Sequence, residues 1–182
     1  LSRQPLRGGR RSPEASGRGD SQRARRAHHG VQGRRQAARG PTHRAALDGH
    51  TGRLGIHGPF EGLDIHNKDP ELRAIISSRF NTALEAADRI GARQVVLHSP
   101  YTYWYQNNVL ASPGYAENVQ GRVHQVLDPV VRNAEDKGIT LVLENIQDVR
   151  PETRRALVDS FGSSAIALSI DTGHAQLARR MS

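Results

Sequence analysis

The feature that most constrains the fold is a set of four short apolar runs, each ending on a residue type that can bind a metal ion. The runs end at His57, His98, Glu144 and Asp171. Short, nearly continuous apolar runs are typical of strands buried in a parallel sheet. The carboxyl ends of successive strands meet at one face of a parallel barrel, where its active sites lie. The sequence therefore predicts that these four side chains gather in one site.

The spacing of the runs predicts helices between them. The run ends are 41, 46 and 27 positions apart, which leaves room for a helix in each interval. Asp69 and Pro70 predict the start of the first helix, and Gly91 its end. A second helix is expected to end at Gly138, and a third to begin at Pro151. Alternating strands and helices predict an α/β fold with a parallel sheet and right-handed crossovers.

The length limits how much of a barrel the chain can form. At 182 residues it is shorter than the roughly 250 typical of a complete eight-stranded barrel. The chain is therefore too short for a complete barrel of that kind. The chain has no cysteine, which excludes disulfides and thiolate metal sites. It shows neither a signal peptide nor an apolar stretch near the roughly 20 residues that span a bilayer, so we expect a cytoplasmic protein.

The positive charge is confined to the first part of the chain. Residues 1–53 contain 13 arginines, no lysine and three acidic residues, a net charge of +10, whereas residues 54–182 carry −2. Residues 1–52 are rich in Arg and Gly and show no hydrophobic period, so we expect them to be disordered. We favour translation in a wrong frame or a mis-called start, because Arg, Gly, Ala and Pro without Lys are what GC-rich DNA encodes out of frame. A solvated tail and an arm that binds nucleic acid are the alternatives.

The residues at the run ends predict a divalent metal. Carboxylates such as Glu144 and Asp171 suit Mg²⁺ or Mn²⁺, and neighbouring imidazoles shift the preference toward Mn²⁺, Co²⁺ or Zn²⁺. His174 follows Asp171 by three residues, so a turn would bring both toward one centre. The alternative for Asp171 is a helix N-cap, and for His57 and His98 a structural hydrogen bond.

An aromatic segment follows the second run. Residues 101–105 contain three of the four tyrosines and the only tryptophan, Trp104. We expect an irregular loop that walls a pocket, where it stacks on a sugar ring or shuts out water; the alternative is packing against a partner subunit. His66 is expected at the surface, and His124 has no assigned role.

Four motifs together resemble a known superfamily. They are His-Gly-Pro-Phe at 57–60, Leu-His-Ser-Pro at 97–100, Leu-Glu-Asn at 143–145 and Asp-Thr-Gly-His at 171–174. In this order they resemble the xylose isomerase-like barrel superfamily, which includes sugar phosphate isomerases and epimerases and endonuclease IV-type DNA repair enzymes. The resemblance covers about residues 54–180. It implies an α/β fold that is a partial (β/α)8 TIM barrel of about four central β-α units over residues 53–182. The last two motifs are fairly specific to the superfamily, and none is specific to a substrate.

The resemblance implies a role for each motif residue. Glu144 and Asp171 look like metal ligands, Glu144 also like an acid-base residue, and His174 like a substrate-binding or second-metal residue. His57 and His98 match positions that bind additional zinc in the endonuclease branch and line the pocket in many isomerases. We assign catalysis to Glu144 and His174. We assign substrate binding to His57, His98, Trp104 and Asn145.

The implied function is that of a metal-dependent sugar or sugar phosphate isomerase or epimerase, which transfers a proton beside a metal-polarised carbonyl through an enediolate. The alternatives are an endonuclease IV-like zinc-dependent AP endonuclease, disfavoured by the charge of −2, and a non-catalytic fragment with an arginine arm. Family barrels take a further His and Glu ligand from their last two strands, and these have no counterpart here. We therefore expect this polypeptide alone to be inactive and prone to aggregate at open sheet edges. The expected partner is a small sugar or polyol rather than nucleic acid or membrane, and the oligomeric state stays open.

Overall fold

The computed structural model describes residues 39–148 and 150–181. The chain divides into two compact units, Leu1–Thr42 and His43–Ser182, and the second contains every strand that the structure describes. Most of the segment expected to be disordered, residues 1–38, lies outside the described residues. The remainder of that segment includes helix α2 (Arg39–Ala46), which the composition did not predict.

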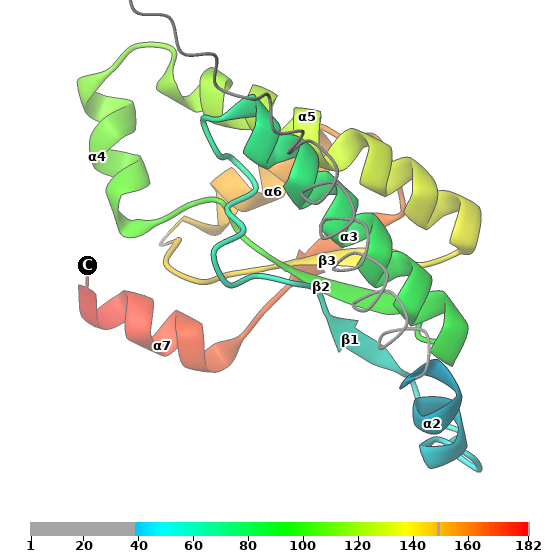
Figure 1. Ribbon diagram of the computed structural model, residues 1–182. Coiled ribbons are helices and arrows are strands. Elements are labelled where there is room, and N and C mark those ends of the chain that lie inside the picture. The colour runs from blue at the N-terminus through cyan, green and yellow to red at the C-terminus, as the bar shows by residue number, and fades with distance from the viewer. Residues whose placement is uncertain (1–38, 149, 182) are drawn as a thin grey trace, which may run out of the picture. The chain divides into compact units, whose positions relative to one another are not determined.

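One sheet of four parallel strands organises the second unit, as predicted (Figure 1). The strands lie in chain order and are β1 (Gly55–His57), β2 (Gln94–His98), β3 (Thr140–Glu144) and β4 (Ile166–Ser169). The helices between and after them are α3 (Pro70–Ile90), α4 (Tyr103–Ala111), α5 (Tyr115–Lys137), α6 (Pro151–Asp159) and α7 (Thr172–Met181). Strands paired in chain order and separated by helices are the arrangement of successive β-α units in a barrel.

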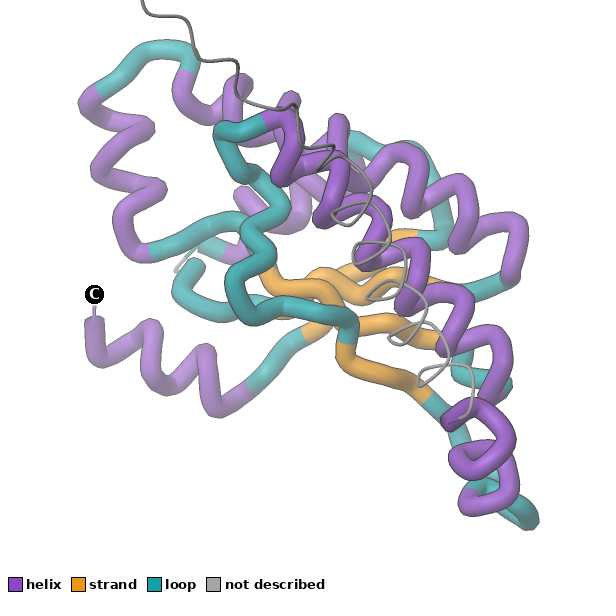
Figure 2. The backbone as a smooth tube through the Cα atoms, viewed as in Figure 1, coloured by secondary structure: helices purple, strands orange, loops and turns teal. Residues whose placement is uncertain are grey.

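The hydrophobic core lies between the sheet and its helices. Figure 2 shows α3 and α5 beside each other over one face of the sheet. Val95 and Leu97 of β2 and Leu141 and Leu143 of β3 point into this layer and are almost completely buried. Burying each such side chain stabilises the fold by roughly 1.5–3 kcal/mol. Because side chains alternate along a strand, the residues between them and at the strand ends face the opposite side of the sheet.

The expected helix boundaries are confirmed. The Asp69 side chain accepts hydrogen bonds from the backbone N–H groups of the first turn of α3, and Pro70 begins the helix. Gly91 ends it with φ of 78°, in the left-handed region that glycine adopts without strain. Pro129 lies inside α5, where a proline would ordinarily kink or break a helix, yet α5 continues as one helix through it. We attribute this continuity to its long buried apolar face, which outweighs one lost backbone hydrogen bond.

Two expectations were wrong in detail. The aromatic segment is not an irregular loop, because Tyr103–Ala111 forms α4. The fourth strand lies earlier than its apolar run suggested and ends two residues before Asp171. The reason is its register, in which Ser169 pairs with Glu144, the last residue of β3, so Ile170 has no partner there. Within residues 39–148 and 150–181, no helix is long and apolar enough to cross a membrane.

Candidate metal centre

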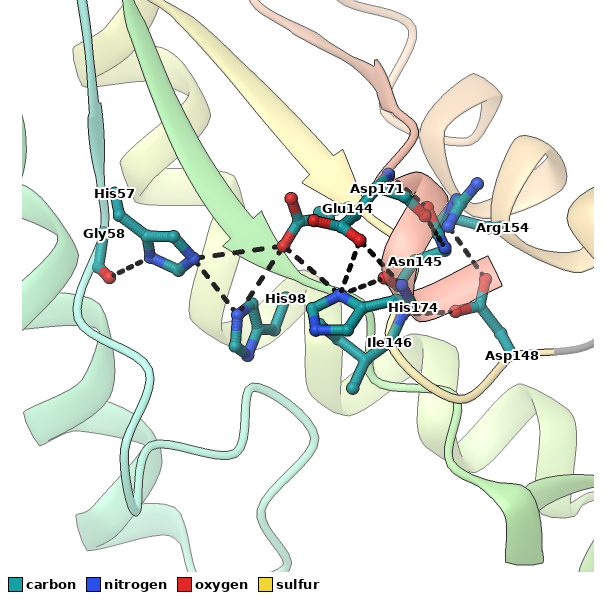
Figure 3. A network of polar contacts seen from close by, with 10 residues as sticks. All are labelled: His57, Gly58, His98, Glu144, Asn145, Ile146, Asp148, Arg154, Asp171 and His174. Carbon is teal, nitrogen blue, oxygen red and sulfur yellow. Dashed lines mark hydrogen bonds and ion pairs between the residues drawn. The ribbon is translucent and has the colours of Figure 1, made fainter. Parts of the chain in front are cut away.

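Three of the four predicted strand-end residues meet at the carboxyl edge of the sheet. His57, His98 and Glu144 each direct one ligand atom to a common point, and these atoms lie within 4.8 Å of one another (Figure 3). The Nε2 atoms of His57 and His98 are 3.1 Å apart. The Glu144 Oε2 atom is 3.9 Å from the first and 3.7 Å from the second. Parallel pairing causes this convergence, because His98 and Glu144 are partners in the β2–β3 register.

A close approach at Gly58 fixes His57 at the end of β1. The Gly58 N–H donates to the Val96 carbonyl at 2.9 Å, and a Cβ on Gly58 would lie only 2.7 Å from that oxygen. The turn therefore requires glycine. The His57 Nδ1 atom donates to the Gly58 carbonyl at 2.8 Å. A carbonyl can only accept, so the proton is on Nδ1 and Nε2 presents its lone pair to the centre.

The donor set fits a transition-metal ion. Two imidazole nitrogens and a carboxylate oxygen are ligands that zinc takes in proteins. A tetrahedral ion with metal–nitrogen distances of 2.0–2.1 Å places two nitrogens about 3.3 Å apart, and the two Nε2 atoms are 3.1 Å apart. Without an ion, the His98 Nε2–H donates to the His57 lone pair. Metal binding at this point would therefore require the His98 proton to lie on Nδ1.

The surroundings of His98 favour its neutral form. Partial burial lowers the pKa of His98, and the nearby His57 and His174 side chains lower it further. The Phe60 ring lies against both imidazoles, with centroid distances of 4.8 Å to His57 and 4.6 Å to His98. Neutral imidazole is the form that binds metal ions.

The Asn145 side chain connects the end of β3 to the segment after β4. Its Nδ2 donates to the Asp171 carbonyl at 2.9 Å, and the Asp171 N–H donates to its Oδ1 at 2.8 Å. The His174 Nδ1 donates to the Asn145 carbonyl at 3.0 Å and lies 3.9 Å from the Glu144 carboxylate. Asn145 is buried, so this amide pairing is shielded from water. His174 is thus held beside Glu144, with its Nδ1 directed at the Asn145 carbonyl.

Asp171 lies next to the centre but is not one of its three converging ligands. Its Oδ1 accepts the His174 N–H at 2.7 Å and so caps the start of α7. That backbone hydrogen bond holds the pKa of the Asp171 carboxyl below its usual value, with a smaller contribution from the His174 side chain. The same oxygen is 3.8 Å from the His174 Nδ1. The helix-cap alternative therefore describes the position of Asp171, and its role as a metal ligand stays a prediction.

Trp104 lies on a helix rather than on the expected loop, and its role in a pocket wall stays a prediction. It lies on α4 with 65 % of its surface exposed, and its ring contacts Tyr103 edge-on at a centroid distance of 5.4 Å. Trp104 takes no part in the polar network around Glu144 that Figure 3 draws.

The sequence reasoning missed a buried ion pair near the centre. The Arg154 Nη1 lies 3.1 Å from the Asp148 Oδ2, and the two side chains are only 4 % and 2 % exposed. The other Asp148 oxygen accepts the Ile146 N–H at 3.0 Å and so shapes the loop after β3. Neither residue belongs to one of the sequence motifs, and no spacing rule distinguished them from other charged residues. The contacts of Phe60 had a signal in the His-Gly-Pro-Phe motif, whose short turn returns the ring to His57.

Known proteins resemble the chain over most of its length. The sequence model of the xylose isomerase-like TIM barrel family matches residues 29–181. An uncharacterized protein of Methanocaldococcus jannaschii is 26 % identical over 129 residues, which cover 68 % of this chain and 42 % of that protein. A Thermus thermophilus protein, solved after soaking with ZnCl2, is 28 % identical with a TM-score of 0.59, covering 76 % of this chain and 53 % of that one. The structure of a D-tagatose 3-epimerase-like protein is similar with a TM-score of 0.63 at 23 % identity, and the match covers 76 % of this chain and 52 % of that one.

The chain thus spans about half the length of these relatives. The family match begins at residue 29, within the arginine-rich segment, and extends through α7. It includes all four strands and every residue of the candidate centre. The parallel sheet, the strand-end site and the family match agree, and the chain belongs to the xylose isomerase-like TIM barrel family.

Proposed function

We propose that this chain carries the metal-binding part of a sugar isomerase or epimerase site. The observation that supports this most strongly is the convergence of His57, His98 and Glu144 on one point at the carboxyl edge of the sheet. The fold likeness to a D-tagatose 3-epimerase-like protein supports a ketose or a related polyol as substrate. Two imidazole donors favour Zn²⁺, Co²⁺ or Mn²⁺ over Mg²⁺.

In this proposal His57, His98 and Glu144 hold the ion, and Asp171 is a further candidate ligand. The bound ion would act as a Lewis acid that polarises a sugar carbonyl. In the neutral imidazole the His174 Nε2 would accept a proton, because the Nδ1 hydrogen is engaged by the Asn145 carbonyl. Glu144 and His174 are therefore the groups proposed to move a proton at the carbon beside the carbonyl. Asn145 fixes the distance between them.

A phosphodiesterase reaction on DNA is the second candidate. The observation that favours it is the donor set itself, because His57 and His98 match zinc positions of the endonuclease branch and join Glu144 here. The charge of −2 over residues 54–182 opposes it, since binding to a phosphate backbone depends on basic side chains. Cleavage of abasic-site DNA by the zinc-loaded chain would favour this second candidate.

The proposed function is tested by loading the protein with Zn²⁺, Co²⁺ or Mn²⁺ and incubating it with ketoses in deuterated water. We expect the C3 proton of a ketose substrate to exchange with solvent, and the Glu144→Gln and His174→Gln variants to lose that exchange. Glu85→Gln is the matched control, because this glutamate pairs with Lys137 and lies outside the polar network of the centre. Metal binding without exchange or epimerisation in any ketose would contradict the assignment of substrate class. The same assay tests the expectation from the sequence that this 182-residue polypeptide alone lacks turnover, and C3 exchange would overturn that expectation.

A further inference from the structure

We propose that Ser160 is a reactive nucleophile that accepts an acyl group from an activated ester, with His124 as its base and Asp128 orienting the imidazole. The three side chains form a chain of hydrogen bonds between α5 and the end of α6. The His124 Nδ1 lies 2.8 Å from the Asp128 Oδ1, and the His124 Nε2 lies 2.9 Å from the Ser160 Oγ. None of the three belongs to the metal centre. The proposal therefore goes beyond the isomerase assignment and does not depend on it.

The two helices hold these groups in place. His124 and Asp128 are one turn apart on α5 and so share a face of that helix. Ser160 is the capping residue directly after α6. The Phe161 ring stacks on the imidazole, with a centroid distance of 4.2 Å and an angle of 28° between the rings. The carboxylate at one edge and the aromatic ring on one face thus direct the Nε2 atom toward Ser160.

The hydrogen positions follow from the partners of each group. The Asp128 carboxylate can only accept, so the neutral imidazole carries its hydrogen on Nδ1 and presents a lone pair on Nε2. The Ser160 hydroxyl has one hydrogen and two acceptors within reach, this Nε2 and the Leu157 carbonyl at 2.6 Å. Rotation about the Cβ–Oγ bond moves the hydrogen from one acceptor to the other while the heavy atoms stay in place. A nucleophile beside a base that a third group orients is the arrangement that activates a hydroxyl.

The site is open to a reagent from solvent. Ser160 is exposed, and the side chains of His124 and Asp128 are 25 % and 45 % exposed. The hydroxyl can therefore meet an ester without any rearrangement of the two helices.

The acylation step uses only these groups and the ester. The Ser160 Oγ attacks the carbonyl carbon while its hydrogen passes to the His124 Nε2. The Oγ–carbon bond forms, the bond from that carbon to the leaving oxygen breaks, and the imidazolium returns the proton to the leaving oxygen. The Phe161 and Gly162 N–H groups already donate to carbonyls in the last turn of α6, so this turn offers neither of them to the developing oxyanion. The substrate class is therefore an ester with a good leaving group, such as an aryl ester.

The experiment incubates the full chain with a fluorophosphonate in the presence of EDTA, which keeps the metal centre empty. This reagent reacts as an activated ester does, loses fluoride and leaves a stable phosphonyl group on the attacking oxygen. Intact mass follows the rate, and tandem mass spectrometry locates the adduct. We expect a single adduct on Ser160, formed about a hundredfold faster than on Ser164. Ser164 is exposed as well, and no hydrogen bond within residues 39–148 and 150–181 joins it to an imidazole.

Three variants test the role of each group. Ser160→Ala should abolish the labelling, and His124→Gln should slow it about a hundredfold. Asp128→Asn should slow it as well, because an amide N–H facing Nδ1 would move the imidazole hydrogen to Nε2. Urea denaturation checks that each variant is folded.

His66→Gln is the matched control for the base. His66 also contacts an aspartate, Asp64, but lies on the loop after β1, so its loss should leave the labelling rate unchanged. The proposal is overturned if Ser160 reacts no faster than Ser164. It is also overturned if His124→Gln reacts as fast as the unaltered chain. Either result would show that the cluster only links α5 to α6.

Discussion

Replacing Asn145 tests how the end of β3 holds the residues that follow β4. Its amide exchanges two hydrogen bonds with the Asp171 backbone, at 2.8 and 2.9 Å, and Asn145 is 6 % exposed. A hydrogen bond of this kind contributes about 1 kcal/mol net, and an unpaired buried group costs about 1–3 kcal/mol. Asn145→Ala should therefore lower the free energy of unfolding by about 2–3 kcal/mol, measured by urea denaturation in EDTA.

Asn145→Asp makes the test sharper, because it keeps the size of the side chain. One carboxylate oxygen would still accept the Asp171 N–H, but the other would face the Asp171 carbonyl, which is now 2.9 Å from the Asn145 Nδ2. The added charge would also lie beside Glu144. We expect this variant to lose at least as much stability as Asn145→Ala. If Asn145→Asp unfolds at the same urea concentration as the unaltered chain, the paired amide is not what holds this segment.

Asn81 provides the matched control for Asn145. It is an asparagine on α3 whose Oδ1 accepts one hydrogen bond from the Asn133 side chain at 2.7 Å, between helices rather than in the centre. Asn81→Ala should cost about 1 kcal/mol and leave Co²⁺ affinity unchanged. Asn145→Ala should also weaken Co²⁺ binding, because it releases the backbone beside Glu144. Equal Co²⁺ affinities in the two variants would show that Asn145 has only a structural role.

Three further predictions concern the centre and its support. Burial lowers the pKa of His98, so below the ordinary value of 6.5 the unfolded chain binds more protons than the folded chain. The free energy of unfolding of the metal-free protein should therefore fall as the pH drops below 6.5 and level off below the folded pKa. The His98→Gln variant should show a smaller change of stability over this pH range. Gly58→Ala should lower the free energy of unfolding by about 1–3 kcal/mol and weaken Zn²⁺ binding in calorimetric titrations, because its Cβ would lie 2.7 Å from a carbonyl oxygen of β2. The control is Gly121→Ala on α5, where the new Cβ meets no atom within 4 Å and stability should be unchanged or increased. Arg154→Met should lower the free energy of unfolding, measured by urea denaturation, by about 3–5 kcal/mol, because it leaves the Asp148 charge buried and unpaired. The double variant Arg154→Met with Asp148→Leu should recover most of that loss.

Much of the fold was predictable because it depends on local rules. The apolar runs predicted four parallel strands, and the Asp69–Pro70 and Gly91 signals predicted both ends of α3. The fourth strand was misplaced because its bounds depend on register with β3, which is a long-range property. The helix at Tyr103–Ala111 was missed because its aromatic residues show no amphipathic period and none of them is buried within it.

The candidate site was predictable in its members but not in their grouping. Parallel strands must end together, which made the meeting of His98 and Glu144 expected from the sequence alone. The sequence favoured Glu144 with Asp171, whereas the structure groups Glu144 with His57 and His98. The difference comes from Asp171, whose oxygen caps α7, a use that depends on where β4 ends. The Asn145 amide pair and the buried Asp148–Arg154 pair join distant segments and leave no pattern in the sequence.

The most direct measurement is a Co²⁺ titration followed by visible absorption, because low-symmetry Co²⁺ sites with nitrogen ligands absorb strongly. We expect one Co²⁺ per chain, with the absorption lost in His57→Ala, His98→Ala and Glu144→Gln. Asp171→Asn keeps a residue that can cap α7 and should retain the absorption in part. The account is contradicted if His57→Ala and His98→Ala bind Co²⁺ as tightly as the unaltered chain with the same spectrum.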